Sequence, residues 1–163
     1  MERRGGQSGS RRRNGWHSAT GEQRREGLII FLIGAVTVAA AFLPTLPKGI
    51  FLGYDGWFHL ARIESLASAL QNGIFPVKIH PSLNFTYGYG VGFFYPDFFL
   101  YLPAFLMMAG LSVTAAYKIF LLLIFIALFG STYTVLRRLT QRAEAAVCGA
   151  VALTLSFNLF WNV

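Results

Sequence analysis

Three long apolar runs set the hydrophobic pattern of the chain. They cover residues 28–46, 119–136 and 145–163, and none contains an aspartate, glutamate, lysine or arginine. A helix needs about 20 predominantly apolar residues to cross the hydrocarbon of a bilayer. The pattern therefore predicts transmembrane helices over about residues 28–46, 113–136 and 143–163.

The composition agrees with an all-α integral membrane protein. Hydrophobic residues make up 55% of the 163 residues, and charged residues only 13%. A soluble domain with this balance would have too little polar surface to cover its apolar residues. The first run is longer than the apolar part of a secretory signal, about 7–15 residues, so we read it as a retained anchor.

The positive charge is concentrated at the N-terminus. The formal net charge is +7, and seven of the fourteen basic residues lie within residues 1–27, together with three acids. This segment has few apolar residues to bury, so we expect a disordered basic tail, retained in the cytoplasm by its arginines and touching membrane lipids. The charge does not indicate nucleic-acid binding. The single cysteine, Cys148, lies in the third run and reads as a small apolar filler.

Residues 93–112 are long enough to cross the membrane but contain Pro96, Asp97 and Pro103. If they crossed, the arginines of residues 137–142 would lie on the outer side, against the positive-inside tendency. We expect instead a broken helix at the outer interface. Residues 47–112 then form one external loop. The chain ends inside the third apolar run, which indicates the N-terminal part of a longer protein.

An amphipathic helix is predicted over residues 56–72 of the external loop. Asp55 is a suitable N-cap, and Gly73 is a typical stop signal. The apolar positions recur at helical spacing: Trp57, Leu60, Ala61, Ile63, Ala67 and Leu70. We expect this helix to lie along the outer membrane surface, with its apolar side toward lipid or toward the spans.

Asp55, His59 and Arg62 fall on nearly the same face of that helix, at about 100° per residue. A carboxylate can accept a proton or hold a cation, a neutral imidazole can do either near pH 7, and guanidinium grips phosphate oxygens. The alternative is that Asp55 only caps the helix while His59 and Arg62 solvate its outer face.

Residues 80–103 are dense in glycine and aromatic residues. Tyr87, Tyr89 and Tyr95 could stack on a sugar face or a polyprenyl chain, although such rings also form ordinary interfacial belts. Asp97 stands between two prolines in an apolar segment, where an acid near lipid is costly and is by default a functional candidate. Its alternative role is to cap the half-helix after Pro96.

Several stretches together resemble a known family. "GYDGWFHLARIESLASALQNGIFPVKI", "YGYGVGFFYPDFFLYLPAFL", "AYK" and "RRL" are similar to the N-terminal part of a bacterial multi-pass membrane family labelled the 6-pyruvoyl-tetrahydropterin synthase-related membrane domain. That family is similar in plan to the C-type glycosyltransferases, which have an early acid in the first external loop and surface helices parallel to the membrane. The resemblance covers about residues 28–163.

The resemblance implies transfer of a sugar from a polyprenyl-phosphate donor to a cell-envelope acceptor at the outer face of the cell membrane. Asp55 and Asp97 would be the catalytic acids, and His59 and Arg62 would bind substrate with the three tyrosines. Mg²⁺ or Mn²⁺ held by the two acids would suit this chemistry, but two separated acids do not establish a metal. The alternative is a non-catalytic envelope protein, either a carrier of lipid-linked substrate or an assembly partner of another membrane protein.

Overall fold

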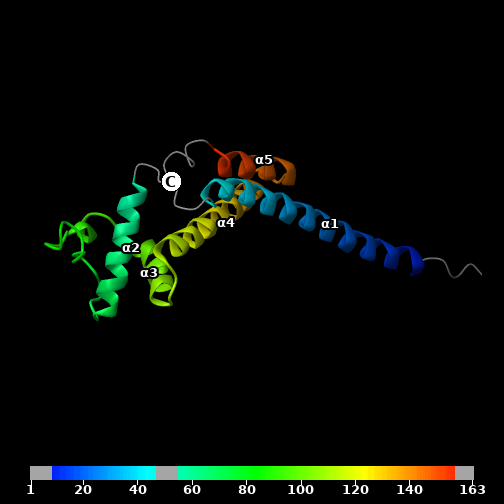
Figure 1. Cartoon of the computed structure of the whole chain (residues 1–163). Helices are drawn as coiled ribbons and strands as arrows, with labels where there is room; N and C mark the ends of the chain where they lie inside the picture. The colour runs from blue at the N-terminus through cyan, green and yellow to red at the C-terminus, as the bar shows by residue number, and fades with distance from the viewer. Residues whose placement is uncertain (1–8, 47–54, 157–163) are drawn as a thin grey trace, which may run out of the picture.

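The computed structural model describes residues 9–46 and 55–156. In these ranges the elements are α1 (Gly9–Phe42), η1 (Leu43–Thr45), α2 (Gly56–Gln71), η2 (Val91–Phe93), η3 (Phe98–Leu100), α3 (Tyr101–Met108), α4 (Val113–Thr140) and α5 (Ala143–Thr154). The described part of the chain is all-α, with five α-helices and one isolated antiparallel bridge in place of a sheet. Figure 1 shows α1, α4 and α5 packed together, with the first half of α1 extending away from the other two helices, and α2 and α3 gathered at one end of α4.

Two helices are long and apolar enough to cross a membrane. They are Gly21–Thr45, formed by most of α1 with η1, and Val113–Thr140, which is α4. The 28 residues of α4 extend about 42 Å, more than the roughly 30 Å of hydrocarbon in a bilayer. Gln141 ends α4 in the left-handed conformation with φ 58°, so the chain turns directly after the arginines of the last helical turn.

The predicted third span is described only in part. Helix α5 has 12 residues, which extend about 18 Å and are too short to cross the hydrocarbon. Residues 157–163, the rest of the predicted span, lie outside the described residues. The described part of the chain therefore contains two helices of spanning length where the pattern predicted three.

The N-terminal segment differs from its expectation. We expected residues 1–27 to be disordered, but α1 begins at Gly9, so residues 9–27 are helical; residues 1–8 lie outside the described part. The physical reason is that extending an existing helix needs no new nucleus. Residues 22–26, with the sequence EQRRE, are moreover all good helix formers.

Helices α1, α4 and α5 pack around one apolar cluster. Its buried members are Val38, Ala41, Phe125, Phe129 and Ala150. Gly34 of α1 lies against this cluster, where a Cβ would be 2.7 Å from a ring carbon of Phe129. Glycine therefore permits α1 and α4 to approach closely, as small residues do between helices in membranes.

The predicted amphipathic helix is confirmed as α2, over Gly56–Gln71. Gly73 ends it as predicted: with φ +76°, it donates to the Leu70 carbonyl, while the amide of Ile74 donates to the Ala69 carbonyl at 3.0 Å. This is the Schellman pattern of helix ends. The apolar face of α2 packs on protein, against α3 and the first turns of α4.

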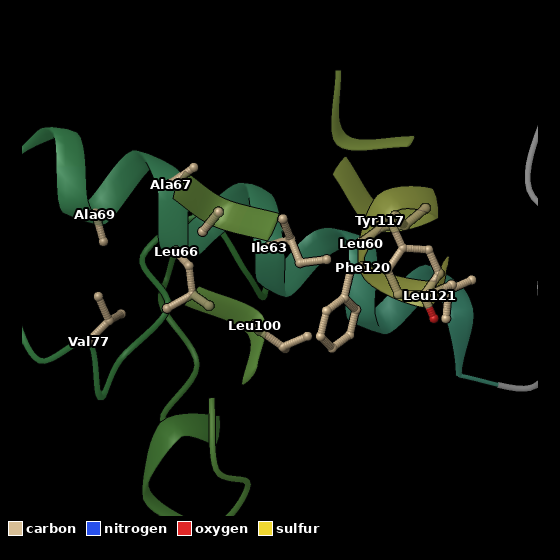
Figure 2. Close-up of a cluster of buried hydrophobic side chains, with 11 residues drawn as sticks. Leu60, Ile63, Leu66, Ala67, Ala69, Val77, Leu100, Tyr117, Phe120 and Leu121 are labelled. Atoms are coloured by element: carbon tan, nitrogen blue, oxygen red, sulfur yellow. The ribbon is translucent and has the colours of Figure 1, made fainter. Parts of the chain in front are cut away.

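Figure 2 shows the cluster that joins these elements. Side chains of α2 point toward Leu100 of η3 and toward α4. Its buried members are Leu60, Ile63, Leu66, Ala67, Ala69, Val77, Leu100, Ala104, Tyr117, Phe120 and Leu121. Burial of large apolar side chains contributes about 1.5–3 kcal/mol each, so this cluster fixes α2, η3 and α3 on the end of α4.

The segment over residues 93–112 is broken, as predicted. The turn η2 ends at Phe93, the chain bends through Pro96, and η3 and α3 resume at Phe98. The carbonyl of Asp97 accepts from the amides of Leu100 and Tyr101 at 2.8 and 3.2 Å. The position of this segment relative to the membrane remains a prediction.

We expect Gly34→Val to lower the free energy of unfolding by about 1–3 kcal/mol, because an added side chain overpacks the contact with Phe129. Gly130→Val is the matched control, since a Cβ at Gly130 meets nothing within 4 Å. Denaturant unfolding in detergent micelles measures both. Equal stability of the two variants would contradict the close α1–α4 approach.

Candidate functional site

The centre of the site is Arg62, which is only 2% exposed although it lies in the middle of α2. Its Nε donates a hydrogen bond to Asp97 Oδ1 at 3.1 Å, and its Nη2 donates to the same oxygen. The two residues are 35 positions apart in the chain. The burial of Arg62 excludes the alternative in which it solvates the outer face of the helix.

His80 completes the buried cluster from the other side of Asp97. Its Nε2 lies 3.0 Å from Asp97 Oδ2, and the side chain is fully buried. With a proton on Nε2, the His80 ring donates a hydrogen bond to this oxygen. Asp97 then accepts from both neighbours, and its charge balances that of Arg62.

The backbone holds His80 in place through a bridge to Tyr89. The amide of His80 donates to the Tyr89 carbonyl at 2.9 Å, and the amide of Tyr89 donates back at 3.1 Å. These two bonds close the loop between the residues and aim the imidazole inward. The sequence analysis did not select His80, because its partner lies in another segment and no periodicity connects the two.

Two aromatic rings cover the guanidinium of Arg62. Its Cζ lies 5.3 Å from the ring centre of Phe58 and 5.5 Å from that of Tyr95. The two rings are 6.4 Å apart and meet edge to face. Such cation–π contacts contribute about 0.5–2 kcal/mol each, so the rings offset part of the cost of burying a cation.

Gly92 lets the aromatic segment pass close to the site. A Cβ there would lie 2.8 Å from the Val77 carbonyl oxygen, 2.9 Å from that of Lys78 and 3.0 Å from Asp97 Oδ2. At Gly92 the close approach is to the protein's own backbone and to the carboxylate of the cluster.

A pocket of about 300 Å³ opens beside Arg62. One wall is polar, with His59, Arg62 and Tyr95, and the other is apolar, with residues of η3 and α4. The lining residues are His59, Arg62, Tyr95, Pro96, Phe99, Leu100, Tyr117, Phe120, Leu121 and Ile124. The pocket thus joins a buried cation to the apolar surface of a candidate span.

The predicted acids occupy different environments. Asp97 is held in the buried ion pair, whereas Asp55 is exposed at the N-terminus of α2. Both stand at the N-cap position of a helix, but neither side chain makes a capping hydrogen bond. Capping alone therefore explains neither acid.

Of the three predicted tyrosines, Tyr95 lies at the site, stacked near Arg62. Tyr89 reaches the ring of Phe58, with the ring centres 6.5 Å apart. Tyr87 is 88% exposed and does not line the pocket. Of the three tyrosines, only Tyr95 therefore lines the pocket.

A metal site is not formed by the candidate acids. In the described ranges, no three His, Cys, Asp or Glu side chains are grouped so as to hold an ion. His80 and Asp97 form only a pair, and Arg62 already balances its charge. These residues do not fit Mg²⁺ or Mn²⁺, which prefer several oxygen ligands.

His59 lies between Asp55 and Arg62 along α2. Its Nδ1 is buried and has no hydrogen-bond partner in the described part of the chain. Burial, and after it the charge of Arg62, holds the pKa of His59 below its ordinary value of 6.5, while Asp55 raises it. The imidazole is therefore neutral at pH 7.

Comparisons with known proteins add no relative: no protein-family model, curated protein or solved structure matches the chain.

We expect Asp97→Asn to lower the free energy of unfolding by about 3–5 kcal/mol, because it leaves Arg62 buried without an anionic partner. Glu64→Gln, at an exposed position of α2, is the matched control. The double variant Arg62→Met with Asp97→Leu should recover most of the loss. If Asp97→Asn and the control agree within about 0.5 kcal/mol, the ion pair does not hold the fold.

We expect NMR titration of the folded protein to give His59 a pKa below 6.5. The unfolded chain then binds more protons, so the contribution of His59 to stability is full above pH 6.5 and falls as the pH drops toward the folded pKa. Asp55→Asn should lower the pKa of His59 further, and Glu64→Gln should leave it unchanged. A pKa that does not respond to Asp55→Asn would show that the two side chains do not interact.

Proposed function

We propose that the chain is a multi-pass protein of the cell membrane, with the buried cluster on the outer side. The two helices of spanning length support this. Arg25 of α1 and Glu144 of α5 line one cleft, so the arginine-rich end of α1 and the α4–α5 turn lie together. The cluster packs on the opposite end of α4. All these arginines then lie on one side of the bilayer, as the positive-inside tendency requires.

We further propose that this protein is a glycosyltransferase of the C type, which takes a sugar from a polyprenyl-phosphate donor and transfers it to an envelope acceptor. The observation that supports this most directly is the pocket beside Arg62. Its polar wall offers a guanidinium and an imidazole, and its apolar wall belongs to α4. A ligand with a phosphate at one end and a hydrocarbon chain at the other matches both walls.

The chemistry assigns different tasks to the two acids. Asp55 is exposed and makes no capping bond, so its carboxylate is available as a general base. It would take the proton of the acceptor hydroxyl while that oxygen bonds to the anomeric carbon of the sugar. The bond from this carbon to the phosphate oxygen breaks, and polyprenyl phosphate leaves.

Arg62 stabilises the charge of the departing phosphate. Its Nε and Nη2 are bound to Asp97, which leaves Nη1 for a ligand. Asp97 acts through Arg62 in this proposal, as a positioning residue that holds the guanidinium at the pocket wall. His59, neutral at pH 7, lies between the base and the cation.

One observation favours the non-catalytic alternative, a carrier of lipid-linked substrate or an assembly partner. Both carboxylate oxygens of Asp97 already accept hydrogen bonds within the protein. One of the two acids expected to act in catalysis is therefore already hydrogen-bonded within the protein. A carrier that binds its ligand through Arg62 needs no general base.

Reconstituted protein should bind polyprenyl phosphate more tightly than the polyprenol of equal chain length, because only the phosphate meets Arg62. We expect Asp55→Asn to retain this binding but to lower transfer by about 10²–10⁴-fold, the usual contribution of a general base. The assay supplies radiolabelled polyprenyl-phosphate hexoses one at a time, with envelope membranes as acceptor.

Glu64→Gln is the control for loss of an acid on α2. Equal binding of phosphate and alcohol would overturn the phosphate site. Preserved binding without transfer by the unmodified protein would establish the carrier, and full transfer by Asp55→Asn would remove Asp55 from the mechanism.

A further inference from the structure

The short helical segment formed by η3 and α3 is apolar on both of its faces. One face is buried within the protein, through Leu100, Pro103 and Ala104. The opposite face is exposed, with residues whose exposed fractions run from 40% to 76%: Phe98, Phe99, Leu102, Phe105 and Met108. We call these five residues the anchor face.

The anchor face differs from the outer face of α2. Outward positions of α2 include Glu64, Ser68 and Gln71, as is usual where a helix meets water. No charged residue occurs between residues 98 and 117. A helix that is apolar all round is stable only where something apolar covers its free side.

The position of the anchor face indicates what covers it. Phe99 and Ile124 line the same pocket, so the anchor face adjoins the outer surface of α4. That surface is itself apolar and exposed at Ile119, Leu123 and Ile126. The anchor face is therefore continuous with the surface that a span presents to lipid.

We propose that η3 and α3 form a membrane anchor that inserts the anchor face into the leaflet at the Val113 end of α4. Phe98–Met108 extends only about 16 Å as a helix, about half of the hydrocarbon thickness, so it lies in one leaflet and does not cross. Its aromatic residues suit the interfacial region of that leaflet. We expected from the sequence that residues 93–112 lie at the outer interface and α2 along the membrane surface, without specifying which face meets lipid. Because the apolar face of α2 is covered by α3 and α4, the face left for lipid is that of η3 and α3.

This inference rests on the membrane location in the proposed function and not on sugar transfer. It places α3 between lipid and α2, so that α2 and its site lie on the water side of the anchor. Loss of transfer activity would therefore leave the inference untouched. Its test is the local environment of the anchor face in a bilayer.

The test uses full-length protein in phosphatidylcholine vesicles on a Cys148→Ser background, with Leu102→Cys carrying a bimane label. Ser68→Cys, exposed on α2, is the matched control, and Phe105→Cys repeats the test if Leu102→Cys does not fold. Lipids carrying a nitroxide near the headgroup should quench Leu102→Cys several-fold more than Ser68→Cys. Aqueous iodide should show the reverse order.

Three results would overturn the anchor. Quenching of Leu102→Cys by iodide alone would place it in water. Stronger quenching by a nitroxide at the chain terminus than by one near the headgroup would mean that the segment crosses the bilayer. Protection from both quenchers would mean that protein, such as a second copy of the chain, covers the anchor face.

Discussion

The ion pair between Arg62 and Asp97 is the interaction on which the arrangement of α2, η3 and α3 depends. Burying two charges costs several kcal/mol per ion unless the geometry and additional hydrogen bonds compensate. Here Nε2 of His80 contacts the second carboxylate oxygen of Asp97, and two aromatic rings cover the guanidinium of Arg62. The cluster therefore links α2, the bridge at Tyr89 and the start of η3.

The buried apolar side chains of the described residues form two separate clusters. One cluster joins α1, α4 and α5, and the other joins α2, η3 and α3 to the first turns of α4. Helix α4 contributes to both, and Phe42 at the end of α1 also packs against both. The segment formed by α2, η3 and α3 thus packs on one long helix, which keeps the wall of the pocket formed by α4 aligned with Arg62.

Periodicity predicted the elements whose contacts are local. Helix α2, its stop at Gly73 and the break near Pro96 follow from residues close in sequence. Their partners could not be predicted: Asp55, His59 and Arg62 do lie along one helix, but the acid bound to Arg62 is Asp97, and the histidine of the cluster is His80. Both come from a segment whose path is set by a bridge and by a glycine at position 92, neither of which has a period that a sequence pattern can reveal.

The pocket has a mechanical consequence. Its lining comes from α2, from residues 95–100 and from α4, so anything that fills it touches α2 and the candidate span α4 at once. A ligand at 100 times its dissociation constant would add about 2.7 kcal/mol to the folded state. Occupancy would therefore strengthen the attachment of α2 and η3 to α4, and this attachment would be weakest in the empty protein.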